Sequence, residues 1–171
     1  NIFNNLILRG KSIPDRSVLY DILCQLELNV DNFLNDRMKN SSLEFTKVNS
    51  MFLMGDSEYF HIAEEGSLKI KEISYINAQA YPLSGLKHGP FALLTDSSFV
   101  ILIESHDGLN RKKIETVYNE ILCRVTNSFN ILIIRENEGL LTNILSRNLY
   151  QEIVIILLQI LSVKLGMLKK I

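Results

Sequence analysis

Residues 99–134 read FVILIESHDGLNRKKIETVYNEILCRVTNSFNILII, and this stretch decides the fold class. Apolar runs at 99–103 and 129–134 flank a polar loop and a helical pattern from 112 to about 125. Neither run alternates with polar residues, so each predicted strand is expected to be buried on both faces. Strands of this kind joined by a helix predict a parallel sheet covered on both faces, which is a three-layer α/β/α sandwich.

The residues before 99 extend the same pattern. Apolar residues recur every three to four positions over 12–40, which predicts a helix, and the apolar run 48–54 ends at Gly55 as a buried strand would. The periodicity is helical again from Ser57 to Tyr81. One arc of that predicted helix is apolar and is expected to be buried: Ile62, Gly66, Ile70, Ile73, Ile76 and Ala80.

Two further segments have distinctive compositions. Helix-breaking prolines and glycines crowd 82–90, and loops of this kind often carry function. A short helix is expected between 135 and 147, and a long apolar helix follows it up to the end of the chain. The uninterrupted apolar part of this last helix, 153–158, is far shorter than the roughly 20 residues that cross a bilayer, so a core or interface helix is favoured over a membrane anchor.

The composition fits one compact domain without a strong electrostatic field. The chain has 171 residues, of which 47% are apolar, and 18 basic against 19 acidic residues give a formal net charge of -1. This balance excludes charge-driven binding to nucleic acid or anionic membranes. Cys24 and Cys123 are too few for a disulfide framework and are expected to be buried thiols in a reducing cytoplasm. Asn1 stands where an initiator Met is expected, which suggests a piece of a longer protein.

Candidate catalytic chemistry lies on the predicted helix from Ser57 to Tyr81. Glu65 lies four residues before Lys69, and Glu72 lies three residues after it, so both carboxylates can reach the same ammonium group. The simplest interpretation is a salt-bridged helix edge. The functional interpretation is that Glu72 is a general base that removes a proton from a carbon next to a carbonyl.

Histidines supply the other titratable candidates. His88 lies in the loop rich in helix breakers, after Pro82 and next to Gly89. There the backbone can approach a ligand and the imidazole can act as acid or base. His61 and His106 lack carboxylates or cysteines at ligand spacing and are interpreted as surface or structural residues. The sequence contains no zinc, iron or phosphate-loop signature, so no metal is predicted.

Two stretches carry a resemblance to a known family. GSLKIKEISYINAQAY at 66–81 and GLKHGPFALL at 85–94 resemble LEGALKLKEISYIHAEAY and GELKHGPLALI. These are the patterns of the second sugar-isomerase (SIS) subdomain in the glutamine:fructose-6-phosphate aminotransferases. The similarity runs without a gap from Gly55 to about Leu94 and is looser on both flanks.

The resemblance implies that fructose 6-phosphate and glutamine-derived ammonia are converted to glucosamine 6-phosphate by imine formation and ketose-to-aldose isomerisation, without a metal or organic cofactor. Glu72 then matches the base that moves a proton between C1 and C2. Lys69 and Glu65 match its polar neighbours in the sugar site, and His88 matches the ring-opening histidine. In the family this histidine reaches the site of the neighbouring subunit, which implies a homodimer.

The resemblance also divides the chain. Residues 1–48 are expected to form an N-terminal helical segment that leads from an absent first SIS subdomain, and residues 49–171 are expected to form a SIS domain. The family's glutaminase domain, its first SIS subdomain with the phosphate-binding loop, and its lysine-bearing C-terminal tail lie outside the chain. Between Ile134 and Leu149 the chain is shorter than the family, where another strand would lie.

Several positions depart from the family pattern and remove or reverse a charge or a glycine. They are Asp56, Ser57, Asn77, Gln79, Ser84 and Gly85. These departures leave two alternatives open. One is a diverged, non-catalytic SIS module that binds a phosphosugar or serves only dimerisation. The other is a different SIS enzyme, such as a sugar-phosphate deaminase or deglycase.

Overall fold

The computed structural model describes residues 15–40, 45–125, 127–136, 138–142, 144 and 149–170. In this part of the chain, four strands form one parallel sheet in the order β2-β1-β3-β4. The strands are β1 (Ser50–Gly55), β2 (Asn77–Pro82), β3 (Ser98–Ile103) and β4 (Ile131–Ile134). The predicted parallel sheet is therefore confirmed.

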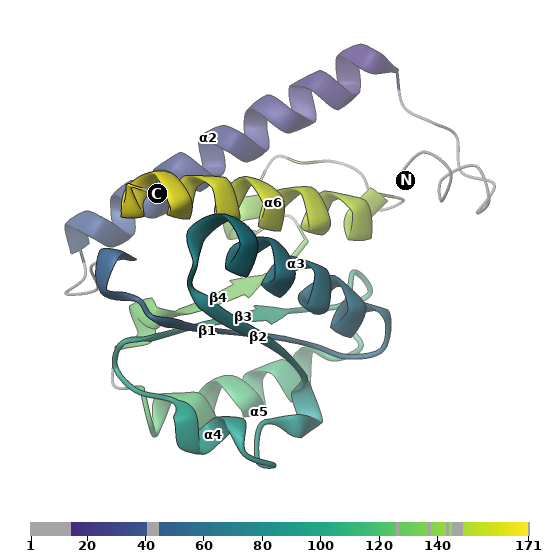
Figure 1. The fold of residues 1–171 in the computed structure, drawn as a ribbon. Helices are drawn as coiled ribbons and strands as arrows, with labels where there is room; N and C mark the ends of the chain where they lie inside the picture. Colours follow the sequence, from purple (N-terminus) through teal and green to yellow (C-terminus); the bar gives the residue numbers. More distant parts are fainter. Residues whose placement is uncertain are drawn as a thin grey trace.

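Helices cover both faces of this sheet (Figure 1). One face carries α2 (Arg16–Asn40), α3 (Glu58–Ser74) and α6 (Tyr150–Lys169). The other carries α4 (Pro90–Leu93) and α5 (Arg111–Leu122). Short 3-10 helices connect these elements: η1 (Phe45–Lys47), η2 (Leu83–Gly85), η3 (Ser128–Asn130) and η4 (Gly139–Leu141). The three-layer α/β/α sandwich agrees with the prediction.

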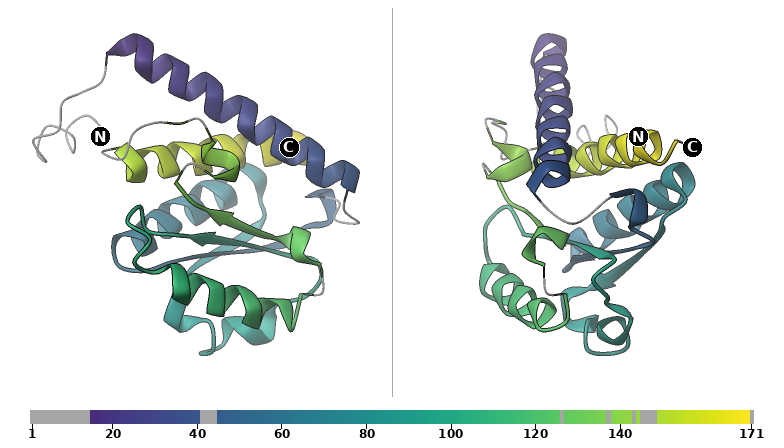
Figure 2. Two further views of the ribbon diagram at one scale, coloured as in Figure 1. Left: turned by 180° about the vertical axis from the view of Figure 1, so that it is seen from behind. Right: turned by 90° about the vertical axis from the view of Figure 1, so that its left-hand side faces the viewer.

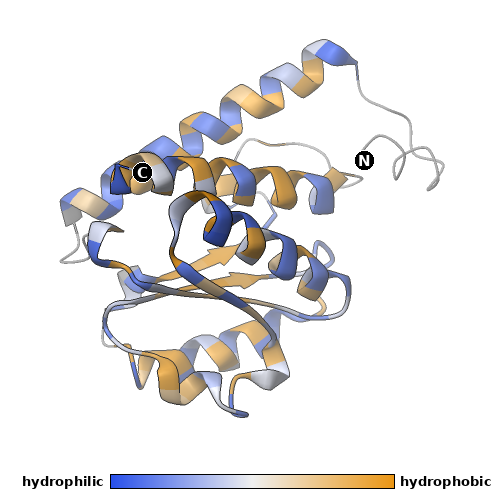
Figure 3. Cartoon of the chain, viewed as in Figure 1, coloured by the Kyte–Doolittle hydropathy of each residue, from blue (hydrophilic) through white to orange (hydrophobic). Residues whose placement is uncertain are grey.

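Two apolar cores fill the space between the layers. Leu26 of α2 and Leu158 of α6 belong to the core on the α3 side, and Ile114 of α5 belongs to the core on the other side. Met51 and Phe52 are neighbours on β1 and enter opposite cores. The sheet accordingly shows hydrophobic residues along β3 and β4 (Figure 3), because a strand covered on both faces has no solvent side.

The apolar helix α6 is a core element of this fold. By length and composition it could cross a membrane, and half of the qualifying window is buried inside the protein. Leu157, Leu158 and Leu161 are fully or almost fully buried against the other helices and the sheet. This burial explains why the segment is so apolar without invoking a membrane.

The single helix predicted from Ser57 to Tyr81 is wrong in its second half. Helix α3 ends at Ser74, Tyr75 adopts a left-handed conformation, and β2 follows as an edge strand paired with β1. Ile76 and Ala80 therefore lie outside the helix, although Ile76 is buried. An apolar residue at every second or fourth position fits both a strand and a helix, so spacing alone did not distinguish them.

The other elements largely follow the prediction, with shorter bounds. The expected strands correspond to β1, β3 and β4, although residues 128–130 form η3 before β4. The short helix expected between 135 and 147 is η4. Helix α2 begins at Arg16, after the non-helical Asp15, and residues 12–14 of the predicted helix lie outside the described range. The expectation of buried thiols is wrong, because Cys24 and Cys123 are both exposed.

Two glycines bring α3 and α6 into close contact. A Cβ atom at Gly66 would lie 2.5 Å from Leu158 Cδ1, and one at Gly166 would lie 2.9 Å from the carbonyl oxygen of Ile73. The second contact involves backbone, which cannot move aside as a side-chain tip can. The absence of a side chain at Gly166 therefore sets the distance between the two helices.

This contact predicts a large effect of Gly166→Leu. Leucine favours helices, so the expected loss of about 3 kcal/mol in the free energy of unfolding would come from overpacking against α3 and not from helix propensity. Val163→Leu places the same side chain on the exposed side of α6 and should change stability by less than about 0.5 kcal/mol. Urea denaturation measures both variants, and equal stabilities would contradict the proposed role of the glycine.

Candidate functional site

The three residues of the predicted catalytic row lie together on α3. The Lys69 ammonium is 2.9 Å from Glu72 Oε2 and 3.9 Å from Glu65 Oε1. The hydrogen bond and charge of Glu72, with a smaller effect from the charge of Glu65, raise the pKa of Lys69. Lys69 is therefore protonated at neutral pH, and its ammonium links both carboxylates along one side of the helix.

This row faces solvent in the single chain. The exposed fractions of the side chains are 30% for Lys69, 40% for Glu65 and 51% for Glu72. Lys69 and Glu65 are partly buried, whereas Glu72 is exposed. Exposed ion pairs contribute little to stability, so the row is not needed to hold α3 in place and its polar atoms are accessible to a ligand.

His88 lies on the other side of the sheet. It is exposed, and its backbone N–H donates a hydrogen bond to the carbonyl of Gly85 between η2 and α4. Its neighbour Leu86 belongs to the core on the α5 side, whereas Ile70, next to Lys69, belongs to the core on the α3 side. The two groups thus lie in different layers (Figure 1), and a single chain does not bring His88 to the row.

The departures at residues 56 and 57 occur where β1 ends and α3 begins. Asp56 accepts a hydrogen bond from the Leu83 N–H at 3.2 Å and pairs with Lys113 at 2.6 Å. Ser57 has φ 50° and ψ -124°, a conformation that costs a residue other than glycine about 1–3 kcal/mol. Gly55 is retained, and a Cβ there would lie 2.5 Å from the carbonyl oxygen of Tyr59. The tight turn is kept, and an acidic side chain now occupies its tip.

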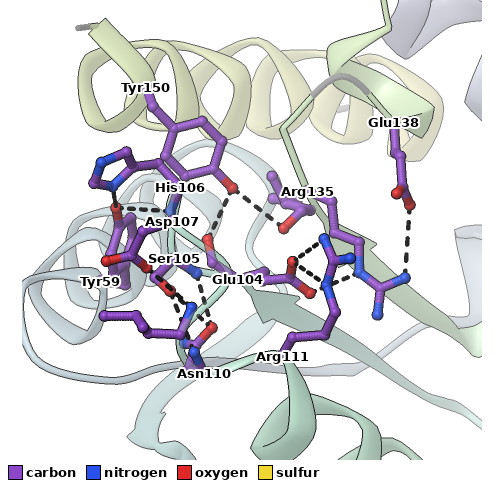
Figure 4. A network of polar contacts seen from close by, with 12 residues as sticks. Tyr59, Glu104, Ser105, His106, Asp107, Asn110, Arg111, Arg135, Glu138 and Tyr150 are labelled. Carbon is purple, nitrogen blue, oxygen red and sulfur yellow. Dashed lines mark hydrogen bonds and ion pairs between the residues drawn. The ribbon is translucent and has the colours of Figure 1, made fainter. Parts of the chain in front are cut away.

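A second polar cluster, which the sequence interpretation missed, lies at the ends of β3 and β4 (Figure 4). Glu104 is only 2% exposed and accepts hydrogen bonds from Arg111 at 2.8 Å and Arg135 at 2.7 Å. The hydroxyl of Tyr150 donates to the carbonyl of Glu104 at 2.8 Å. These bonds join α5, α6 and the sheet at one corner of the domain.

A sequence signal for this cluster exists. Glu104 and Arg135 each follow an apolar strand directly, and in a parallel pair with Ile103 opposite Ile134 the next residues are neighbours. Opposite charges at these two positions therefore predict an ion pair at the carboxyl edge of the sheet. The burial of Glu104 requires this pairing, because an unpaired buried carboxylate would be strongly destabilising.

The remaining histidines have structural partners. His106 lies 3.1 Å from the hydroxyl of Tyr59. His61 lies 2.9 Å from Glu64, so the expectation that no carboxylate is suitably spaced from His61 is wrong. A cavity of about 280 Å³ beside His106 is lined by Glu104, Arg111 and other polar residues of the loop after β3. Among the described residues, no group of three or more His, Cys, Asp or Glu side chains could hold a metal ion.

The strand order, which reverses between β1 and β3, defines a doubly wound α/β domain. The chain belongs to the SIS domain family, whose sequence profile matches residues 44–135, just over half of the chain.

Among its relatives is the glutamine-fructose-6-phosphate aminotransferase (isomerizing) of Bacteroides thetaiotaomicron, 38% identical over 84 residues, which are 49% of this chain and 14% of the relative. The enzyme of the same name from Bordetella pertussis is 51% identical over 67 residues, covering 39% of this chain and 11% of the relative. The Rhizobium meliloti enzyme is 34% identical over 108 residues, which are 63% of this chain and 17% of the relative. The chain thus spans less than a fifth of the length of each relative.

Solved structures share the fold. The C-terminal domain of glucosamine-fructose-6-phosphate aminotransferase from Francisella tularensis has a TM-score of 0.68 at 24% identity, covering 91% of this chain and 44% of that chain. Glucosamine-6-phosphate deaminase from Thermotoga maritima has a TM-score of 0.64 at 16% identity, and the match covers 96% of this chain and 48% of that chain. At these identities the likeness supports the fold alone.

The polar cluster at Glu104 predicts the behaviour of Tyr150→Phe. Loss of the hydroxyl leaves the buried carbonyl of Glu104 without this donor, so the free energy of unfolding should fall by about 1–3 kcal/mol. Tyr75→Phe removes an exposed hydroxyl and should change it by less than about 0.5 kcal/mol.

The same variant has a pH signature. Burial raises the pKa of Tyr150, so the folded chain keeps this proton at a pH where the unfolded chain has lost it. Stability due to Tyr150 is present below about pH 10 and is lost as the pH rises above it. The wild type should therefore lose stability more steeply than Tyr150→Phe between about pH 9 and 11 in denaturant titrations. Parallel pH profiles would contradict this assignment.

Proposed function

We propose that this chain is the C-terminal isomerase portion of a glucosamine-6-phosphate synthase. The reaction converts fructose 6-phosphate and glutamine-derived ammonia to glucosamine 6-phosphate by imine formation and ketose-to-aldose isomerisation. The observation that carries the proposal is the Lys69–Glu72 pair, 2.9 Å apart on the accessible side of α3, in a segment that resembles the aminotransferase pattern. The names of the relatives support the same reaction.

The roles of the row follow from its chemistry. Glu72 is the general base that takes a proton from C1 of the sugar imine and returns it at C2. Lys69 is the positioning residue, because its ammonium restricts the Glu72 carboxylate through a charge-assisted hydrogen bond. Glu65, on the preceding turn, is placed to accept a hydrogen bond from a sugar hydroxyl.

His88 completes the site from a second copy of the chain. It would open the sugar ring, and its position in the layer opposite the row supports its use in a neighbouring subunit. The proposed enzyme is therefore a cytoplasmic homodimer. Its division into a helical segment at 1–48 and a SIS domain at 49–171, and its need for a glutaminase domain and a first SIS subdomain, are parts of the same proposal.

One observation favours a second candidate, a diverged SIS module without catalytic activity. Asp56 and Lys113 pair at the carboxyl edge of the sheet, between β1 and β3, where open α/β sheets usually bind ligands. The strained Ser57 lies beside this pair. Such a module would bind a phosphosugar or serve dimerisation.

The decisive experiment for the proposed function is a hybrid enzyme. Residues 15–170 of this chain replace the matching region of the Bacteroides thetaiotaomicron aminotransferase, and both glutamine hydrolysis and glucosamine 6-phosphate formation are measured. We expect Glu72→Gln to lower glucosamine 6-phosphate formation at least about 100-fold with glutamine hydrolysis retained, because only the base is removed. Glu64→Gln, an exposed carboxylate on the same helix, is the matched control and should leave both rates within about twofold.

Two outcomes would count against this account. Synthesis retained in Glu72→Gln would remove this residue from the mechanism. A wild-type hybrid that hydrolyses glutamine but forms no glucosamine 6-phosphate would favour the non-catalytic module. Calorimetric titration of the chain with fructose 6-phosphate would then separate a phosphosugar-binding module from one that only dimerises.

A further inference from the structure

The turn that ends α3 holds a tyrosine in a conformation that favours glycine. Tyr75 has φ 53° and ψ 19°, which lie in the left-handed region. Glycine is the usual residue where a helix ends in this conformation, because a side chain there is sterically unfavourable. The flanking residues Ser74 and Ile76 are both buried, so the backbone is held on either side. The path from α3 into β2 therefore imposes this conformation on Tyr75.

The side chain of Tyr75 contributes little to the fold. It is 73% exposed, so its ring buries little apolar surface. A glycine or an asparagine would satisfy the same turn at a lower conformational cost. A strained residue whose side chain hardly packs against the rest of the domain points to a role other than folding.

Tyr75 belongs to an exposed stripe that includes the proposed base. Leu68, Glu72 and Tyr75 are separated by four and three residues, so they follow one another along one side of α3. Leu68 is 42% exposed, and Glu72 is exposed between the two. At 3.6 residues per turn, Glu65 and Lys69 fall on the other side of Glu72. The Glu72 carboxylate therefore has a charged flank and an apolar flank.

The helical layer leaves this apolar flank accessible. Seen from the side (Figure 2, right), α3 lies at the margin of its layer, and α6 lies between it and α2. The inner contact with α6 is made by Gly66 and Ile73. Leu68 and Tyr75 stay exposed, so the described part of the chain leaves room beside them. Residues three apart on a helix are neighbours, so a molecule held at Glu72 can also contact the ring of Tyr75.

We propose that the ring of Tyr75 binds the sugar phosphate of the proposed reaction by packing against its C–H groups. A sugar presents hydroxyl groups on its edges and C–H groups on its faces, which match the charged and the apolar flank of Glu72. A ligand without an apolar face would use the charged flank alone. The inference rests on the proposed function, because it places the substrate at Glu72, and it adds Tyr75 as a substrate-binding residue.

The test uses the hybrid enzyme that carries residues 15–170 of this chain. Tyr75→Gly should raise KM for fructose 6-phosphate at least about fivefold, with kcat and glutamine hydrolysis within about twofold of the wild type. Tyr75→Phe keeps the ring and should leave KM within about twofold. In the 171-residue chain, Tyr75→Gly should raise the melting temperature by about 2–4 °C, because glycine relieves the left-handed conformation. A tyrosine needed only for folding would instead lower the melting temperature when replaced.

Calorimetric titration of the hybrids with fructose 6-phosphate separates this inference from the proposed function. In a hybrid that binds the sugar without forming product, weaker binding by Tyr75→Gly would support the contact and refute the reaction. In a hybrid that forms product, unchanged KM and affinity in Tyr75→Gly would overturn the contact and leave the reaction standing. Absence of binding by the wild-type hybrid would overturn both. Dissociation of the Tyr75→Gly hybrid into monomers, measured by sedimentation, would assign the ring to a subunit contact and overturn the inference.

Discussion

The close contact between α3 and α6 at Gly66 and Gly166 is the constraint on which the candidate site depends. A side chain at either position would meet atoms of the facing elements at 2.9 Å or less, and because the atom that faces Gly166 is backbone, the helices can approach this closely only with glycine at this position. The inner face of α3 is buried against α6 and the sheet. The polar groups of α3 therefore lie on its exposed side. There the ion pairs of Lys69 with Glu65 and Glu72 are not needed for the stability of the fold.

The layered architecture explains why one chain supplies only half of the groups of each proposed active site. A three-layer sandwich separates the helices on its two faces by the full thickness of the sheet, and the loop with His88 lies on the face opposite α3. Rotating side chains cannot bridge that separation. A reaction that uses both His88 and Glu72 therefore requires two chains, whereas a row that is only a salt-bridged helix edge does not.

Much of this could be predicted from the sequence. The runs before Glu104 and Arg135 contain β-branched and apolar residues without alternation, and only a strand buried on both faces needs that pattern. The end of α3 at Ser74 was not predictable from spacing, because Ile76 fits a helix and a strand equally well, and the next residue, Asn77, donates its N–H to the carbonyl of Asn49, which lies far away in sequence. The pairing of Glu104 with Arg135 was predictable from the opposite charges that directly follow β3 and β4, whereas the second partner, Arg111, comes from α5 and carries no such signal.

Mixed-dimer complementation tests most directly the proposal that Glu72 and His88 act in one site built from two chains. Hybrid enzymes carrying Glu72→Gln or His88→Ala, each expected to be inactive in synthesis, are mixed in equal amounts under conditions that exchange subunits. A shared site predicts recovery of about a quarter of the wild-type rate, since about half of the dimers are mixed and each mixed dimer has one intact site. Failure to recover activity, with subunit exchange demonstrated, would contradict the claim.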